Sequence, residues 1–256
     1  MIHRVVAPNP GPMTLTGTNT YLVVAEGAVA VIDPGPDDLP EHLEAILSAA
    51  EPLGRITTVL VTHRHNDHLP LAFPLCERTG ATLCGHAGLP RVQRALSDEE
   101  ACFGSYVALE TPGHTRDSLS YWDPTSRDLF TGDLVLGTGS VIVDDSPGAL
   151  SDYVSSLQRL LALQPRTIHP GHGPLVEDAP AKLQEYITHR QQREQQVISA
   201  LLAAGSATVE QLVAAIYIDL APNLAPMAAR NVGACLDKLN SEHRVVNDGP
   251  TWRLTS

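Results

Sequence analysis

Four turns rich in histidine and aspartate, each directly after an apolar strand-like run, constrain this sequence most. They are T-H-R-H-N-D-H at 62–68, T-P-G-H-T at 111–115, T-G-D at 131–133 and P-G-H-G at 170–173. Turns at strand ends often carry function, because a rigid scaffold holds them in place. Imidazole nitrogens and carboxylate oxygens, without thiolates, bind Zn²⁺, Mn²⁺ or Fe²⁺. We therefore expect a sheet protein whose strand ends meet at a metal site.

The first of these turns predicts two ions rather than one. His63, His65, Asp67 and His68 can surround a single ion only if the chain turns tightly. His63 and His65 share one side of the chain, whereas Asp67 and His68 point elsewhere. This division favours a binuclear site.

The first 180 residues mix strand-like and helix-like segments, as expected for sheets with helices packed outside. Residues 57–63 form a continuous apolar run that is typical of a buried strand. Residues 40–50 place apolar side chains on one helical face. The other expected strands are 21–25, 28–33, 81–85, 106–110, 118–123, 128–133 and 166–171, and the other expected helices are 70–79 and 150–163.

The last 75 residues change in character. Residues 181–203 contain neither Gly nor Pro and predict a long helix. Thr208 and Gln211 form a capping-box pattern before a second helix. A third helix over 227–242 leads to a hairpin around Asp248-Gly249. This order is that of a winged helix-turn-helix, so we expect domains at 1–180 and 181–256.

Charge restricts the partners that the chain can bind. The 256 residues carry a net charge of −12, and residues 1–181 hold all of it, with 22 acidic residues and ten arginines. Such an acidic chain argues against broad, non-specific binding of nucleic acid. The C-terminal segment is neutral overall, but it could still carry a local basic stripe that binds phosphate. The residues that could form this stripe are Arg230, Lys238, Arg244 and Arg253.

The sequence shows no membrane or export signal. No apolar run approaches the roughly 18 residues that would argue for a membrane span, and the N-terminus MIHRVVAPNP lacks an apolar signal core. The four cysteines form no C-x-x-C pair, so we expect free thiols. These features predict a soluble, cytoplasmic protein.

Taken in order, Asp33, the H-x-H-x-D-H run at 63–68, His114, Asp133 and His172 resemble the metallo-β-lactamase superfamily. The resemblance covers about residues 1–180 and implies an α+β fold, the αββα sandwich, here with a small winged-helix domain added. It implies that Asp133 bridges two divalent ions and that Asp33 orients a ligand histidine. It also implies that His63, His65 and His114 hold one ion and that Asp67, His68 and His172 hold the other.

Within that superfamily, the long start at 9–23 and the winged helix resemble the β-lactamase-like-protein-2 group. That group includes endoribonucleases that act on single-stranded RNA. The resemblance implies hydrolysis of a phosphodiester by a metal-bridging hydroxide, with Asp67 as the catalytic residue that orients it or accepts a proton. Arg64 and Arg116 would meet phosphate oxygens. The sequence departs from the pattern at 69–72, where L-P-L-A replaces a glycine-containing turn.

Other functions remain open. T-H-x-H-x-D-H and T-P-G-H-T also resemble glyoxalase II, so a small thioester or lactone is the alternative substrate, although its basic, tyrosine-bearing lid is absent from the sequence. A DNA-binding sensor would tolerate the loss of ligands, and a mononuclear iron oxygenase would not need Asp67, His68 and His172. The winged helix could instead shape the cleft or mediate a homodimer. Zn²⁺ is favoured by the ligand mix, and Mn²⁺ or Fe²⁺ would also suit it.

Overall fold

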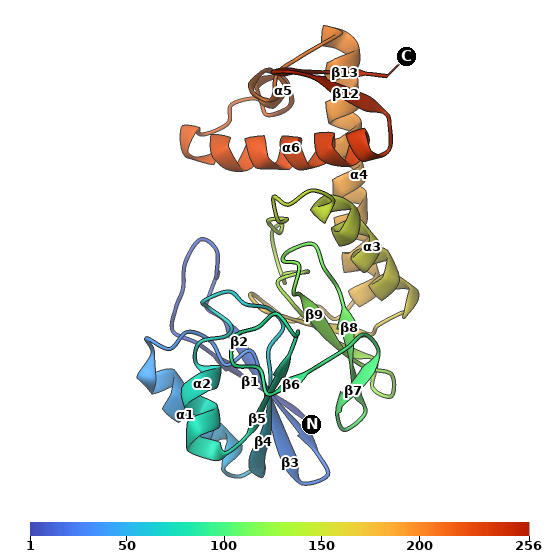
Figure 1. Ribbon diagram of the computed structural model, residues 1–256. Coiled ribbons are helices and arrows are strands. Elements are labelled where there is room, and N and C mark those ends of the chain that lie inside the picture. Colours follow the sequence, from blue (N-terminus) through green and yellow to red (C-terminus); the bar gives the residue numbers. More distant parts are fainter. Residues whose placement is uncertain (256) are drawn as a thin grey trace.

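Two β-sheets stacked face to face form the centre of the N-terminal part (Figure 1). The computed structural model describes residues 1–255. The first sheet has the order β1-β2-β3-β4-β5-β6 and the second the order β11-β10-β9-β8-β7. The strands of the first sheet are β1 (Ile2–Val6), β2 (Asn19–Ala25), β3 (Ala28–Ile32), β4 (Arg55–Leu60), β5 (Thr82–Gly85) and β6 (Arg94–Ala95). Those of the second are β7 (Glu100–Phe103), β8 (Tyr106–Glu110), β9 (Leu119–Asp123), β10 (Asp128–Gly132) and β11 (Thr167–Pro170).

Turn chemistry and crossovers set the strand order. Glu26 and Gly27 both have positive φ, which is the two-residue hairpin geometry that joins β2 to β3. The helices α1 (Pro40–Ala50) and α2 (Ala72–Thr79) connect the parallel neighbours β3, β4 and β5. In the second sheet only β10 and β11 are parallel.

Three apolar layers confirm the expected αββα sandwich. Ile46 and Leu75 pack the helices α1 and α2 onto the outer face of the first sheet. Tyr121 and Phe130 belong to the layer between the two sheets. Tyr153, on α3 (Ala149–Ala162), belongs to the layer outside the second sheet. Burial of these layers is the main stabilising term of the fold.

The C-terminal part has the predicted winged-helix order (Figure 1). Thr208 and Gln211 form the capping box predicted before the second helix. The helix α4 runs without a break from the second sheet into this domain, so the chain crosses between the two parts inside a helix. The elements are α4 (Ala179–Ala204), α5 (Val209–Ile216), a short 3-10 helix (Pro222–Leu224), α6 (Ala225–Ser241), β12 (Val245–Asp248) and β13 (Thr251–Leu254).

The structure adds strands that the sequence pattern does not predict. β1, β6 and β7 lie at sheet edges, and none shows the strict alternation of apolar and polar residues that marks a half-buried strand. All four cysteines are free, as expected. None of the helices within residues 1–255 is both long and apolar enough to cross a bilayer.

Candidate metal centre

All seven side chains predicted to bind metal meet at one edge of the sandwich. They follow the ends of four strands: four of them lie in the 63–68 run after β4, His114 follows β8, Asp133 follows β10 and His172 follows β11. Their ligand atoms fall into two groups, and within each group all of them lie within 4.8 Å of one another. Asp133 belongs to both groups.

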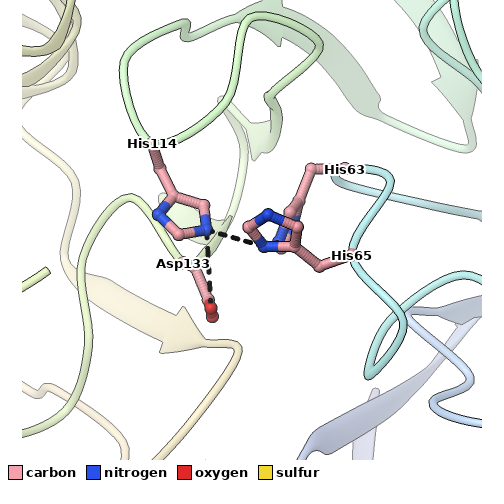
Figure 2. A group of neighbouring side chains, drawn as sticks. All are labelled: His63, His65, His114 and Asp133. Carbon is pink, nitrogen blue, oxygen red and sulfur yellow. Dashed lines mark hydrogen bonds and ion pairs between the residues drawn. The ribbon is translucent and has the colours of Figure 1, made fainter. Parts of the chain in front are cut away.

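The first group contains His63, His65, His114 and Asp133 (Figure 2). His63 Nε2 lies 3.0 Å from His65 Nδ1, and His114 Nε2 lies 3.1 Å from the same atom. Asp133 Oδ2 is 3.8 Å from His114 Nε2. A tetrahedral Zn²⁺ with bonds of about 2.0–2.1 Å holds its ligand atoms roughly 3.3 Å apart. The observed spacing therefore suits one such ion.

The second group contains Asp67, His68, Asp133 and His172. His68 Nε2 and His172 Nε2 are 3.3 Å apart, and each is 3.4 Å from Asp133 Oδ1. Asp67 Oδ2 is 3.1 Å from His172 Nε2. The two oxygens of Asp133 thus face different groups, which is the arrangement that a bridging carboxylate requires.

Hydrogen bonds to the outer ring nitrogens turn the inner nitrogens toward the site. His68 Nδ1 donates to Asp33 Oδ2 at 2.9 Å, and His114 Nδ1 donates to the Ile142 carbonyl at 2.8 Å. His172 Nδ1 faces the Gly17 carbonyl at 3.3 Å. Because these partners only accept, each outer nitrogen carries the proton and each inner nitrogen offers a lone pair. This is how proteins orient metal-binding histidines.

Asp33 also acts on His63 through Thr62. The Thr62 hydroxyl donates to Asp33 Oδ2 at 2.7 Å, so it accepts from His63 Nδ1 at 3.0 Å. The Thr62 N–H donates to the other Asp33 oxygen. One buried carboxylate therefore positions a histidine in each group.

The charge distribution suits cations. Burial lowers the pKa of His63 well below its usual value, so this ring is neutral and free to coordinate. Burial would also lower the pKa of His172, but the adjacent carboxylates of Asp133 and Asp67 outweigh it and raise that pKa to about 9. The two carboxylates thus draw positive charge into this corner of the site.

Two further observations support the fit to metal ions. Asp133 Oδ1 is buried and has no hydrogen-bond partner within the described residues, and such an orphaned acceptor is costly without a counter-charge. Gly171 packs directly against the site, because a Cβ there would lie 2.5 Å from Asp133 Oδ1. The residues present therefore fit two divalent ions, and their donor set alone does not select the metal.

The metal groups open into a pocket of about 290 Å³. Arg64 lines this pocket, and its side chain is 59% exposed, with Nε 3.8 Å from Asp117. Arg116 does not line it, because its Nε donates to Ser146 on the neighbouring loop instead. The predicted phosphate contact is thus sterically available to Arg64, whereas Arg116 would have to leave Ser146 to make it.

Several residues of the site have no clear signal in the sequence. Thr62 precedes the histidine run, but only the structure shows that its hydroxyl joins two site residues. The Ile142 and Gly17 carbonyls come from loops distant in sequence. Asp117 is buried, and neither carboxylate oxygen has a hydrogen-bond partner among residues 1–255. Of these residues, only Asp117 has a signal in the sequence, because it ends the T-P-G-H-T-R-D run.

Comparison with known proteins agrees with this geometry. The model of the metallo-beta-lactamase superfamily matches residues 13–100 and 89–172. The model of the beta-lactamase associated winged helix domain matches residues 208–252. Together these matches span both parts of the chain.

Individual relatives extend the similarity over nearly the whole length. A beta-lactamase-like protein 2 homolog from Caenorhabditis elegans is 31% identical, over 96% of this chain and 86% of the relative. An atrochrysone carboxyl ACP thioesterase from Aspergillus fumigatus is 36% identical, over 87% of this chain and 75% of the relative. The metallo-beta-lactamase family protein TTHA1429 from Thermus thermophilus shares the fold, with 23% identity, a TM-score of 0.79, and coverage of 99% and 98%. The chain thus belongs to the metallo-beta-lactamase superfamily and is a hydrolase-type member with an associated winged helix.

Proposed function

We propose that this chain is a metal-dependent hydrolase of a carboxylic thioester or ester. The observation that carries the proposal is the charge around the site, which suits a small or weakly charged substrate better than a polyanion. The groove beside the metal groups is lined by three aspartates, Asp144, Asp145 and Asp237, and by two cations, Arg230 and Lys238, so it carries no excess of positive charge. Burial alone would raise the pKa of Asp144, but the hydrogen bond from the Ser146 N–H lowers it, so this carboxylate stays negative.

The cations of the winged helix lie next to acidic side chains and therefore form no net positive stripe. Nucleic-acid affinity depends on free basic groups that replace counterions along the phosphate backbone. All four candidates for a basic stripe instead form ion pairs with acidic side chains. The pairs are Arg230 with Asp145, Lys238 with Glu194 and Glu242, Arg244 with Glu194 and Glu242, and Arg253 with Asp248.

The named relatives support the same substrate class. The relative from Aspergillus fumigatus, 36% identical to this chain, is named as an ACP thioesterase. The T-H-x-H-x-D-H and T-P-G-H-T runs resemble those of thioester hydrolases of the glyoxalase II type.

The residues of the site have definable roles in such a reaction. Divalent ions at the two groups would supply Lewis acidity and lower the pKa of a coordinated water toward neutrality. Asp67 is 27% exposed and faces both the pocket and His172, so it can accept the proton of the attacking water. The water oxygen bonds to the carbonyl carbon, the C–S or C–O bond breaks, and the leaving thiolate or alkoxide takes up that proton. Asp33 holds His68 and, through Thr62, His63 in place throughout.

A parallel assay tests the proposal. Protein loaded with Zn²⁺, Mn²⁺ or Fe²⁺ is given S-phenyl thioacetate, a simple lactone and a labelled single-stranded RNA. Metal content is measured in the wild type and in Asp67→Asn. We expect thioester or lactone turnover that falls at least about 100-fold in Asp67→Asn. RNA cleavage lost in Asp67→Asn, with no turnover of the small substrates, would overturn the proposal.

Single-stranded RNA is the second candidate, and one observation favours it. Arg64 stands at the pocket rim with an exposed guanidinium beside the metal groups, where a phosphate oxygen could accept from it. An endoribonuclease of this kind would bind RNA through the catalytic part. Its cleavage would fall in Arg64→Ala and not in Arg253→Ala.

A further inference from the structure

The winged-helix domain brings one basic side chain to the metal pocket. Arg230 on α6 lines the same pocket as His65, Asp67, His114 and Asp133. It is separated by more than 90 positions in the chain from each of these residues. The pocket is therefore built by both parts of the protein.

A groove continues from this pocket beneath α6. A second hollow of about 140 Å³ shares Val143, Asp144 and Arg230 with the metal pocket. Arg230, Gly233, Ala234 and Asp237 line it at intervals of three and four residues, so one face of α6 forms its wall. A Cβ at Gly233 would meet no atom within 4 Å, which shows that the wall leaves open space.

Arg230 is the cation of this groove that a ligand can most easily engage. Within residues 1–255 its one ion pair is with Asp145 at 3.5 Å, and the two side chains are 50% and 75% exposed. Such exposed pairs contribute at most about 1 kcal/mol, so a ligand can displace Asp145. Lys238, by contrast, is 15% exposed and lies 2.6 Å from the similarly covered Glu194.

We propose that Arg230 binds a carboxylate on the substrate and that the winged helix thereby completes the active site. This inference rests on the proposed thioester or ester hydrolysis. A guanidinium matches a carboxylate with two parallel hydrogen bonds. A carboxylate carries a single negative charge, which suits a groove that Asp144 also lines.

Matched substrates test the inference. S-phenyl thioacetate is neutral, S-(4-carboxyphenyl) thioacetate carries the carboxylate on the thiol side, and S-phenyl thiosuccinate carries it on the acyl side. We expect Arg230→Ala to raise KM about tenfold or more for one of the two carboxylate substrates. The rise of KM for the neutral substrate is at least fivefold smaller than that for the carboxylate substrate, and Arg230→Lys recovers part of the loss.

Two further variants sharpen the result. Arg253→Ala removes an exposed arginine of the wing that is paired with Asp248, and it should change no kinetic constant. Asp145→Asn releases Arg230 from its partner and should lower KM for the same carboxylate substrate. An equal rise of KM for neutral and charged substrates in Arg230→Ala would overturn the inference, because the side chain would then only shape the pocket.

The inference and the proposed function can fail separately. If the wild type hydrolyses no thioester or ester, the proposed function fails. Calorimetry then tests whether Arg230 binds a carboxylate. It measures the binding of succinate and of 4-mercaptobenzoate to the metal-loaded wild type and Arg230→Ala. If Arg230→Ala binds either ligand about tenfold more weakly than the wild type, the carboxylate site is supported. If the variant binds both ligands as tightly as the wild type, the inference is overturned.

Discussion

At the scale of single residues, Asp33 organises the metal centre. Its backbone has φ of 50°, a left-handed conformation that few residues other than glycine, asparagine and aspartate adopt. The Asp33 N–H donates to the Leu60 carbonyl, and the Asp33 carbonyl accepts from the Thr20 hydroxyl. The backbone is therefore held on both sides, and the carboxylate accepts three hydrogen bonds within the site. Strain kept in place at a functional site is a recurrent feature of proteins.

Replacement of this carboxylate should weaken metal binding. Asp33→Asn keeps the shape and tolerates the backbone, but its NH₂ group would face donors from Thr62 or His68. We expect affinity for both metal ions to fall about 10–100-fold in a chelator competition assay. Thr62→Val removes only the link to His63, so it should weaken the first group more than the second. Equal weakening of both groups by Thr62→Val would contradict this division.

His42 on α1 is a buried histidine next to the backbone of Asp33. It is 1% exposed, and its Nε2 donates to the Thr20 hydroxyl at 2.9 Å, which in turn donates to the Asp33 carbonyl. Its Nδ1 is buried without a partner among the described residues. A second proton on this ring would have no acceptor, and burial lowers the pKa of His42 to about 4.

This histidine should destabilise the protein in acid. The unfolded ring, with a pKa near 6.5, binds a proton more readily than the folded ring between pH 6.5 and 4. Its contribution is therefore complete above pH 6.5 and is lost as the pH falls, by about 2 kcal/mol at pH 5. Urea unfolding should show the wild type losing more stability from pH 7 to 5 than His42→Gln. His3→Gln, at an exposed site, should follow the wild type.

At the scale of elements, the loop between β10 and α3 links the metal centre to α4. The Tyr186 hydroxyl on α4 donates to the Gly139 carbonyl and accepts from the Leu136 N–H. The buried Arg190, also on α4, donates to the Val141 carbonyl at 2.6 Å. The next carbonyl, that of Ile142, holds His114. The helix thus sets the position of a loop that orients His114, a predicted metal ligand.

Loss of one of these hydrogen bonds should lower both the stability of the protein and its affinity for cations. Tyr186→Phe leaves the Gly139 carbonyl and the Leu136 N–H without their shared partner. We expect a loss of about 1–3 kcal/mol in unfolding free energy. Cation affinity should fall with it, because the loop that positions His114 is loosened. Tyr217→Phe changes a tyrosine beside Arg193 on α4, away from this loop, and serves as the control. Unchanged stability in Tyr186→Phe would contradict this account of the loop.

Element boundaries show where sequence reasoning reaches its limit. The apolar run at 57–63 predicts a strand through His63, but β4 ends at Leu60. The strand ends early because the Thr62 N–H turns to the Asp33 carboxylate rather than to a neighbouring strand. The helix predicted over 150–163 agrees with α3 within one residue at each end. Helical periodicity is a local signal, whereas the end of this strand depends on a residue 29 positions away.

At the scale of the whole molecule, the two parts share one apolar layer. Leu183 and Ile187 on α4 belong to the same cluster of buried residues as Val197, Leu201 and Leu236. This cluster continues from the second sheet to the centre of the winged helix. Because no polar linker interrupts this cluster, the two parts share a continuous apolar core.

Metal removal should therefore destabilise the molecule as a whole. The ligands come from four strand ends, so ions that bind only the folded state raise its stability by mass action. We expect EDTA to lower the thermal midpoint by several degrees and Zn²⁺ to restore it. The double variant His63→Ala, His172→Ala should show no EDTA shift. A shift of equal size in that variant would place the stabilising ion elsewhere.

The sequence alone determined the family, the helices of both parts and the order of the residues that form the candidate metal groups. These signals lie within turns, caps and short periodic runs, which are set by local backbone chemistry. Only the tertiary structure decided that Thr62 joins Asp33 to His63, that Arg116 turns to Ser146, and that Arg230 reaches the metal pocket. Such pairings depend on how distant segments pack. His68 and His172, for example, lie 104 positions apart in the chain and meet in the site. No local pattern encodes a contact of that range, because it forms only when both sheets and α4 are in place.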